Sequence, residues 1–313
     1  MLLLGCGYLG TALARVALAG GESVAALTRS EARASELRAM GLGKVVIGDI
    51  ASDDWHDALE PSGQDIVFSV APSEPNEAGY RRAFLDGAHA VGRWLESATA
   101  SGKAPARSLV FTSSTSVYPQ FDGKWVAEDS PFDASDLSPS GKILRQTEEI
   151  FQRLAPRLVG RVWILRLAGL YGPERHHLLD VLRAGETTFP GRGDHWLNLI
   201  HRDDAVRAIR ACLSAPQQVH GGIFNVTDGE PATKKDVITW LAQQLGINTA
   251  SIHFDASQSP RSAHRKPSKK DAPNRKISNK YLCDTLGFKP LKHSYREGYA
   301  SLISGLGCQG NVK

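Results

Sequence analysis

The sequence has 313 residues, of which 42% are hydrophobic and 22% charged, and its formal net charge is +4. These values are ordinary for a soluble globular protein of one or two domains. The mildly basic charge fits an anionic cofactor or substrate without arguing for nucleic acid. No apolar run approaches the roughly 18–20 residues that span a bilayer. The four cysteines form no C-x-x-C pair, so we expect no metal site, no disulfide framework and a cytoplasmic location.

The first thirty residues have the pattern of a strand, a turn, a helix and a second strand. Residues 2–4 and 23–27 are apolar runs, and residues 11–19 form an alanine-rich helical pattern. The turn at residues 5–10 has the sequence G-x-G-x-x-G. A βαβ unit with this motif at its first junction is typical of dinucleotide-binding domains.

Each glycine of the motif has its own predicted role. Gly5 makes the tight turn, Gly7 lets the backbone approach a pyrophosphate, and Gly10 lets the helix pack closely on the strand. The phosphates would lie at the helix N-terminus, beside Tyr8 and Leu9, where free N–H groups and the helix dipole favour negative charge.

Strands and helices continue to alternate up to residue 167. Near-continuous apolar strands between helices imply a parallel sheet covered on both faces. Right-handed crossovers make it a doubly wound α/β sheet of the Rossmann type. The expected strands are residues 44–47, 65–70, 107–112 and 161–167, and the expected helices are residues 29–40, 55–59, 77–101 and 140–154.

Beyond Gly169 the regular alternation stops, and shorter elements follow. We expect a strand at 196–200, a helix at 203–213 and a strand at 223–226 to return to the main sheet. The helix pattern at 233–245 has Thr233 as its N-cap and Gly246 as its stop. Shorter helices are expected at 177–183, 279–286 and 295–304. The predicted division is a dinucleotide-binding domain of residues 1–168, joined by 196–228, and a smaller, discontinuous C-terminal substrate lobe of 169–195 and 229–313.

The end of the second strand predicts which nicotinamide cofactor is bound. An NAD site normally presents Asp or Glu there to the ribose 2′-hydroxyl, whereas Arg accommodates a 2′-phosphate. Here Thr28 is followed by Arg29, and Arg33 lies one helical turn further on. A guanidinium pairs with a phosphate bidentately, so NADP is preferred over NAD. The alternative is that Arg29 merely points to solvent.

The carboxyl ends of the other strands predict further cofactor contacts, because the loops there line the nucleotide crevice. Asp49 is expected near the adenine, Ala71 and Pro72 beside the ribose and pyrophosphate, and Leu167 near the nicotinamide. The alternative for each is ordinary loop structure.

Five segments carry a resemblance to a known family. They are LVFTSSTSVY at 109–118, LRLAGLYGP at 165–173, LIHRDDA at 199–205, FNV at 224–226, and SNK at 278–280 with LGF at 286–288. In this order and spacing the chain resembles the extended short-chain dehydrogenases/reductases, the NAD-dependent epimerase/dehydratase group. The resemblance spans nearly the whole chain.

The resemblance implies a catalytic triad of Ser or Thr, Tyr and Lys. The serine would be Ser114, with Ser113 as the alternative, and the lysine would be Lys142. At the tyrosine position stands Ser138, so the chain is similar to the atypical subgroup that lacks this tyrosine. Lys142 can still hold the nicotinamide ribose, but a serine hydroxyl is far too weak an acid to replace tyrosine directly.

A replacement proton donor is therefore sought elsewhere. Tyr118 is close in sequence but is expected to be structural. Asp203 and Asp204 are expected to be a helix N-cap and a packing contact. Arg192 could bind an anionic substrate or be a turn residue. Histidine suits proton transfer near pH 7, and the candidates are His176, His177, His195 and His201.

Two functions from different classes fit these features. The first is a cytoplasmic NADP-dependent oxidoreductase or epimerase-like enzyme acting on a small polar carbonyl or alcohol, such as a nucleotide-sugar. The second is a non-catalytic NADP-binding redox sensor or regulator, which the missing tyrosine favours. The basic segment 257–280 is expected to be a solvated loop, with anionic-substrate or nucleic-acid binding as the weaker alternatives. The helices at 77–101 and 140–154 could pair subunits in a homodimer, as they do in the family.

Overall fold

Seven strands form the central sheet in the order β12-β7-β5-β4-β1-β2-β3, and the paired strands from β3 to β5 run parallel. The computed structural model describes residues 1–256 and 273–309. The strands are β1 (Leu2–Leu4), β2 (Ala25–Thr28), β3 (Lys44–Ile47), β4 (Asp65–Phe68), β5 (Ala106–Ser114), β7 (Val159–Leu167) and β12 (Gly221–Val226). The predicted doubly wound Rossmann sheet is confirmed.

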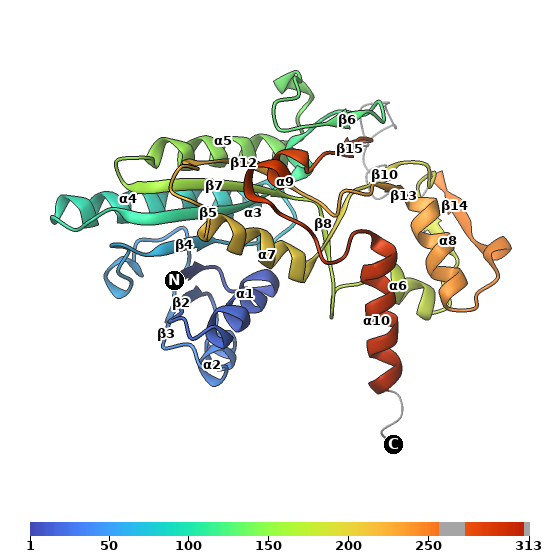
Figure 1. The fold of residues 1–313 in the computed structure, drawn as a ribbon, viewed down its shortest axis with the longest axis horizontal. Helices are drawn as coiled ribbons and strands as arrows, with labels where there is room; N and C mark the ends of the chain where they lie inside the picture. The colour runs from blue at the N-terminus through green and yellow to red at the C-terminus, as the bar shows by residue number, and fades with distance from the viewer. Residues whose placement is uncertain (257–272, 310–313) are drawn as a thin grey trace. The chain divides into compact units, whose positions relative to one another are not determined.

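Helices cover both faces of this sheet. Figure 1 shows α1, α2 and α7 on one face, and α3, α4 and α5 on the other. Their bounds are α1 (Tyr8–Ala19), α2 (Glu31–Ala39), α3 (Glu77–Tyr80), α4 (Gly87–Ala100), α5 (Pro139–Leu154) and α7 (Arg202–Leu213), with a π-helical stretch at Arg81–Asp86 between α3 and α4. Because both faces are covered, every residue of β1 and β4 is buried, as the apolar runs predicted.

The core between the sheet and α5 is aromatic. Phe151 of α5 lies 5.0 Å from Phe68 of β4 and 5.2 Å from Phe111 of β5, measured between ring centroids. All three rings are fully buried. Tilted and edge-on ring pairs of this kind add to the stabilisation that burial alone provides.

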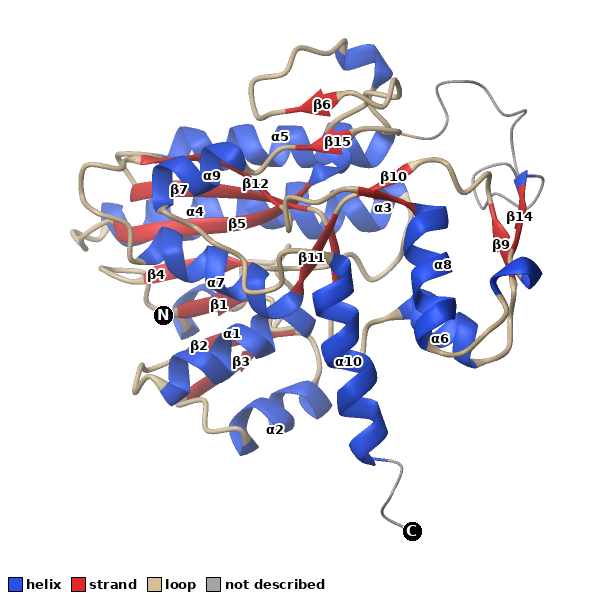
Figure 2. Cartoon of the chain, turned by 45° about the vertical axis from the view of Figure 1, so that its right-hand side comes forward, coloured by secondary structure: helices blue, strands red, loops and turns tan. Residues whose placement is uncertain are grey.

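The chain divides into two compact units. The first consists of residues 1–117, 137–166 and 206–224, and the second of residues 118–136, 167–205 and 225–313. In the second unit, strands pair two by two, and Figure 2 shows them as short arrows. The pairs are β6 (Trp125–Val126) with β15 (Lys276–Ile277), β8 (Gly169–Tyr171) with β11 (Leu199–His201), β9 (Thr188–Pro190) with β14 (His253–Asp255), and β10 (Trp196–Leu197) with β13 (Ala232–Thr233). The predicted division at residue 168 remains a prediction.

The second unit contains the helices α6 (His177–Arg183), α8 (Lys234–Gln244), α9 (Lys280–Leu286) and α10 (Tyr295–Gln309). Among them, α6, α8 and α10 contribute side chains to an apolar cluster. Leu179 of α6, Leu241 of α8 and Tyr299 of α10 belong to the cluster. The predicted cap of α8 is confirmed: Thr233 accepts from the backbone N–H of Asp236, whose carboxylate accepts from the Thr233 N–H in return.

The strand predicted at 196–200 is wrong in its placement. It is two strands, β10 and β11, which pair with β13 and β8 outside the main sheet, whereas β12 does join the sheet as predicted. Asn198 separates the two strands. Its side chain donates to the carbonyl of Arg275 at 2.9 Å and accepts from the N–H of Ile277 at 2.7 Å, so a non-local contact decides the break.

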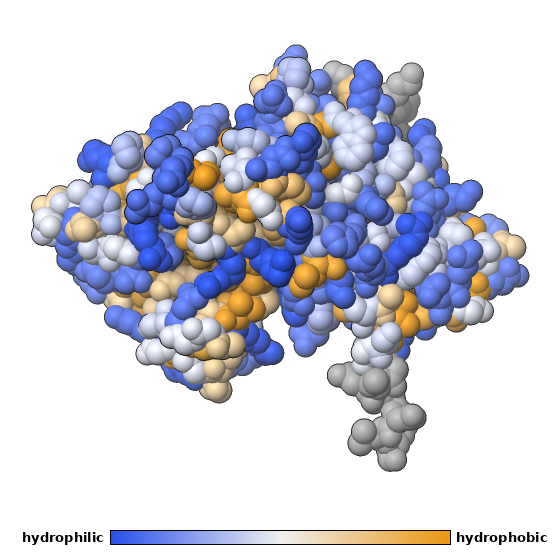
Figure 3. Space-filling model, in the orientation of Figure 1, coloured by the Kyte–Doolittle hydropathy of each residue, from blue (hydrophilic) through white to orange (hydrophobic). Residues whose placement is uncertain are grey.

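Polar residues cover most of the face seen in Figure 3, with smaller apolar groups between them. Among the described residues, no helix has the length and apolar character needed to cross a membrane. Of the basic segment at 257–280, residues 257–272 lie outside the part that the structure describes.

Candidate functional site

The glycine turn joins β1 to α1, and two of its glycines are required by the local geometry. Gly5 has φ +89°, and a Cβ on it would lie 2.8 Å from the carbonyl oxygen of Ser69. A Cβ on Gly10 would lie 2.8 Å from the carbonyl oxygen of Gly5. At Gly7, by contrast, a Cβ would meet nothing within 4 Å, so the space over this residue is open. The predicted turn, close helix packing and open approach are therefore all present.

The N-terminus of α1 is suited to an anion. Gly7 is its N-cap and offers no side-chain acceptor, and the first turn contains no acidic residue. The first N–H groups of a helix have no partner within it, and the helix dipole makes this end positive. Tyr8 is half-buried and Leu9 buried in this first turn. The turn thus fits the pyrophosphate of a dinucleotide.

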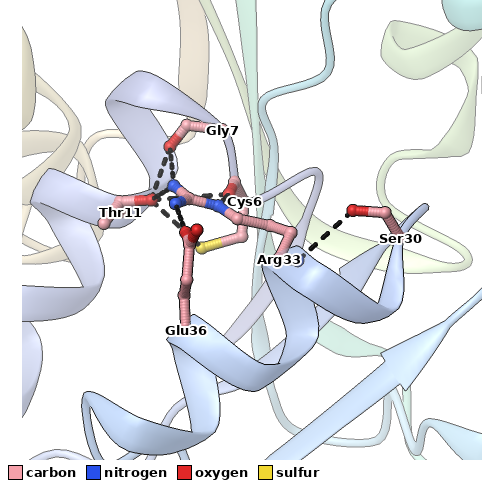
Figure 4. A network of polar contacts seen from close by, with 6 residues as sticks. All are labelled: Cys6, Gly7, Thr11, Ser30, Arg33 and Glu36. Atoms are coloured by element: carbon pink, nitrogen blue, oxygen red, sulfur yellow. Dashed lines mark hydrogen bonds and ion pairs between the residues drawn. The ribbon is translucent and has the colours of Figure 1, made fainter.

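Arg33 of α2 reaches across to the glycine turn. Its guanidinium donates to the carbonyl oxygen of Cys6 at 3.0 Å, to that of Gly7 at 3.4 Å, and to the Thr11 hydroxyl. Glu36, one turn along α2, forms an ion pair with the same guanidinium (Figure 4). Arg33 therefore holds the carbonyl side of the glycine turn.

Arg29 directly follows Thr28, the last residue of β2, and its side chain is exposed. It forms no hydrogen bond or ion pair with the described residues. The carboxylate of Asp49, after β3, accepts from Arg82 at 2.8 and 3.1 Å. Burial by itself would raise the pKa of Asp49, but the bonds from Ala51 N–H and Arg82, with the nearby charge of Arg29, hold that pKa below its usual range.

The remaining predicted cofactor residues follow the ends of their strands. Ala71 is exposed and Pro72 half-buried in the loop after β4, and Leu167 is the last residue of β7. Since β1, β2, β3 and β4 are neighbours in a parallel sheet, Gly7, Arg29, Asp49 and Ala71 follow strands that end at the same edge. This edge is where nucleotides bind in sheets of this kind.

The two candidate serines at the end of β5 differ in their surroundings. Ser113 is buried, and its hydroxyl donates to the carboxylate of Glu148 at 2.7 Å. Ser114 is half-buried, and its hydroxyl accepts from the N–H of Ser116 at 3.2 Å. Successive strand residues point to opposite faces, so Ser113 is directed into the core and Ser114 away from it.

Ser138 and Lys142 belong to the start of α5. Ser138 is the N-cap, and its hydroxyl accepts from the N–H of Gly141 at 3.1 Å. It also lies 3.2 Å from the hydroxyl of Ser140. Lys142 is exposed in the first turn, and α5 packs against the turn Thr115–Val117 that follows β5. Ser138 thus acts as a helix cap.

The model of the "NAD dependent epimerase/dehydratase family" matches residues 1–227. The chain belongs to this family. It is 29% identical to Protein YeeZ of Escherichia coli K12 over 250 residues, which are 78% of this chain and 83% of that protein.

Among solved structures, two of its relatives in fold carry ligands. One is MoeE5 in complex with UDP-glucose and NAD, with a TM-score of 0.74 and 20% identity over 98% of both chains. The other is DesIV, a dTDP-glucose 4,6-dehydratase from Streptomyces venezuelae with NAD and TYD bound. It has a TM-score of 0.73 and 22% identity over 97% of this chain and 96% of that one. At these identities the likeness is one of fold.

Several candidate proton donors have structural roles. Tyr118 is buried, and its hydroxyl donates to Asn225 at 2.8 Å. The buried carboxylate of Asp204 accepts from two backbone N–H groups, those of Leu291 and Lys292, at 2.7 and 2.9 Å. The prediction that Asp204 is a packing contact is therefore confirmed, since each of its carboxylate oxygens accepts a backbone bond.

The candidate side chains on the exposed or half-buried surface differ in their partners. Arg192 is exposed and pairs with the carboxylate of Asp194. His176 lies 2.7 Å from a carboxylate oxygen of Asp180. Asp203 pairs with its neighbour in sequence. His177 is exposed as the first residue of α6, and His195 is half-buried.

His201 is buried, and burial lowers its pKa despite the carboxylates of Asp203 and Asp204 nearby. Its ring packs edge-on against Tyr171, with 5.4 Å between the ring centroids. A neutral, enclosed imidazole of this kind is a core residue, because burial penalises its charged form.

Three basic residues of segment 257–280 lie within the described part: Lys280 is exposed and pairs with Asp284, and the other two, Arg275 and Lys276, are held by the second unit. Lys276 places its ammonium 5.3 Å from the ring centre of Trp125 and 5.1 Å from that of Trp196. Arg275 is buried. Both side chains are therefore used within the fold.

Sequence reasoning missed two features. One is the buried Glu148, which binds Arg166 and Ser113. The other is Asp228, which follows β12 and is 5% exposed. It lines a pocket of about 470 Å³ in the second unit. Other residues that line this pocket are Glu230, Asn279, Cys283, Asp284, Gly287, Phe288, Lys289, Pro290 and His293. Glu148 could have been found from the sequence, because its carboxylate lies on an apolar helix face. No local sequence pattern indicates Asp228.

Proposed function

We propose that this chain is an NADP-dependent oxidoreductase or epimerase-like enzyme that acts on a polar carbonyl or alcohol, such as that of a nucleotide-sugar. The observation that carries the proposal is the glycine turn, where Gly5 and Gly10 are sterically required and the space over Gly7 is open. Membership in the NAD-dependent epimerase/dehydratase family supports the reaction class. When bound, the nicotinamide group would supply hydride transfer.

The preference for NADP is supported by the charges at the crevice edge. Arg29 is exposed after β2 and forms no hydrogen bond or ion pair with the described residues, although its charge acts on nearby Asp49, so its guanidinium can pair with a 2′-phosphate. Asp49, which would repel that phosphate, is paired with Arg82. Arg33 is bound to the glycine turn and to Glu36, so Arg29 is the main phosphate ligand of the proposal.

The proposed roles near the nicotinamide follow from exposure. Lys142 would hold the nicotinamide ribose with its ammonium, and Ser114 would donate a hydrogen bond to the substrate oxygen. The bond from Ser113 to Glu148 supports Ser114 as the polarising residue, because the Ser113 hydroxyl is already committed in the core. Ser138 would cap α5 and take no part in proton transfer.

The test is a titration of the protein with NADPH and NADH, followed by fluorescence. We expect NADPH to bind at least tenfold more tightly, and equal affinities would refute the preference. Incubating the protein with NADP+ or with NADPH and a panel of nucleotide-sugars then tests turnover, because an alcohol needs the oxidised cofactor as hydride acceptor and a carbonyl needs the reduced cofactor as hydride donor. Oxidation of NADPH or conversion of any sugar supports the enzyme.

A non-catalytic redox sensor is the second candidate, and Ser138 is the observation that favours it. Its hydroxyl is used as a helix cap and is a far weaker acid than a tyrosine. Tight binding of NADPH with no turnover across the panel would support this candidate. His177, exposed at the start of α6, is the donor to replace first if turnover is found.

We also propose that the protein is a cytoplasmic homodimer that pairs through α4 and α5. The two helices pack against each other on one face of the sheet. Sedimentation analysis tests the dimer: a monomer at micromolar concentration would refute it.

A further inference from the structure

A buried ion pair is hydrogen-bonded to Ser113, the residue next to the proposed catalytic serine, Ser114. Glu148 of α5 is 1% exposed, and Arg166 of β7 is fully buried. The guanidinium of Arg166 donates to both carboxylate oxygens of Glu148, at 2.7 and 3.0 Å. Ser113 of β5 donates to one of these oxygens at 2.7 Å, and Arg145 to the other at 3.3 Å. One carboxylate thus joins β5, α5 and β7.

Stability alone does not explain this arrangement. Removing two charges from water is costly, and well-packed apolar residues of similar volume are often at least as stable as a buried ion pair. What charged hydrogen bonds add is direction, because their donors and acceptors must meet at fixed angles and distances. The bonds of Glu148 therefore fix the register between β5 and α5.

That register bears on the two proposed site residues. Ser114 directly follows Ser113 on β5, and Lys142 lies six residues before Glu148 on α5, roughly 9 Å along the helix axis. A shift of Glu148 relative to Ser113 would move Lys142 relative to Ser114 by the same amount. Displacements of about 1 Å are enough to weaken catalytic geometry.

We propose that Glu148 and Ser113 are positioning residues that set the distance between Ser114 and Lys142. The inference rests on the proposed function, in which Lys142 holds the nicotinamide ribose. It assigns no contact with cofactor or substrate to either residue. Their effect is confined to the nicotinamide half of the site, because neither belongs to the glycine turn or the end of β2.

The chain offers a matched control at the other end of β5. Ser108 is buried and donates to the buried carboxylate of Asp65 at 2.6 Å, and Asp65 pairs with Arg107. The chemistry is the same as that of Ser113, Glu148 and Arg166. However, Ser108 lies toward the start of the strand, away from Ser114.

The experiment compares the affinity of each variant for NADPH and for 2′-phospho-ADP, which lacks both the nicotinamide and the ribose attached to it. The wild type should bind NADPH more tightly than it binds the fragment, and Lys142→Ala should remove most of this difference in affinity. Ser113→Ala should reduce the ratio of the two affinities about three- to tenfold, the usual effect of one hydrogen bond, with the affinity for the fragment unchanged. Ser108→Ala should leave the ratio at its wild-type value while lowering thermal stability to a similar extent.

Ser113→Ala is the decisive variant, because Glu148 keeps its bonds to Arg166 and the fold should be retained. Glu148→Gln would leave Arg166 buried without its counter-ion and is expected to unfold more readily. A wild type that binds the two ligands equally would overturn the proposed role of Lys142, and this inference with it. The positioning role alone would be overturned if the wild type shows the expected difference in affinity and Ser113→Ala leaves it unchanged. It would also be overturned if Ser108→Ala reduces that difference as much as Ser113→Ala does.

Discussion

Replacing Asp228 by asparagine should change how the stability of this protein depends on pH. The side chain is 5% exposed, and one carboxylate oxygen accepts from the N–H of Glu230 at 3.1 Å. The other oxygen is buried and has no hydrogen-bond partner among the described residues. Burial, reinforced by the carboxylates of Glu230 and Asp204, raises the pKa of Asp228 to about 8.

The direction of the effect follows from which state holds the proton. In the unfolded chain an aspartate has a pKa near 3.9, so between about pH 4 and pH 8 the folded state holds a proton that the unfolded state has lost. The contribution of Asp228 to stability is therefore greatest below pH 4 and falls as pH rises, by up to about 1.4 kcal/mol per pH unit for one proton. From pH 5 to pH 7 the fall amounts to roughly 2–3 kcal/mol.

Asp228→Asn is neutral at every pH, so the wild type should lose this amount of stability relative to the variant over the same interval. Urea unfolding, followed by tryptophan fluorescence at pH 5, 6, 7 and 8, measures the difference directly. All other titrating groups are shared and cancel. Parallel stability curves for the two proteins would show that the buried carboxylate is ionised in the fold and would refute the reasoning.

A second variant tests the cause of the raised pKa. Glu230→Gln removes an exposed neighbouring charge but keeps the backbone N–H that Asp228 accepts from. The pKa of Asp228 should fall, so the steep part of the wild-type curve should end at a lower pH. An unchanged curve would leave burial as the whole cause.

Four further variants test Arg29, the glycine turn and Ser138. Arg29→Ala should weaken NADPH binding about tenfold and NADH binding little, as measured by fluorescence titration. The control is Arg15→Ala, which also replaces an exposed arginine. Equal losses of affinity for both cofactors would contradict the 2′-phosphate contact. Gly10→Ala places a Cβ 2.8 Å from a carbonyl oxygen and should lower the free energy of unfolding by about 1–3 kcal/mol. Gly7→Ala, whose Cβ meets nothing within 4 Å, should reduce NADPH affinity more than it reduces the free energy of unfolding. Ser138→Ala removes an N-cap, so we expect a loss of about 1 kcal/mol in urea unfolding with NADPH affinity unchanged.

Local patterns predicted the first unit well because its elements obey local rules. The apolar runs that become β1, β2 and β4 are continuous, since a parallel sheet is buried on both faces. In the second unit, the cap of α8 is likewise confirmed at Thr233, because its chemistry lies within four residues. The roles of Gly5 and Gly10 follow from the turn geometry that the motif imposes.

The second unit could not be read in the same way, because its strands are two or three residues long and pair across long sequence distances. β6 pairs with β15, and neither has a recognisable period. The break between β10 and β11 depends on bonds from Asn198 to a segment far along the chain. Non-local contacts of this kind leave no mark on a sequence window.

The network around Glu148 lies between these cases. Leu144, Glu148 and Phe151 are spaced by four and three residues, so helical geometry places the carboxylate on the buried face. An arginine within the apolar run of β7 is the matching sign, since a buried charge needs a partner. The two signs together could have indicated the ion pair, although sequence reasoning did not use them, and only the structure adds Ser113 to it.

The position of Ser138 links the fold to the open question of catalysis. As the N-cap of α5 it determines where the helix begins, and therefore where Lys142 lies one turn later. Glu148 fixes the same helix from its middle through Ser113 and Arg166. Two independent sets of bonds thus fix the helix backbone from which Lys142 projects, while no tyrosine stands at the start of the helix. A fixed helix would serve the proposed binding of the nicotinamide ribose both in an enzyme with a donor elsewhere and in a sensor that only binds.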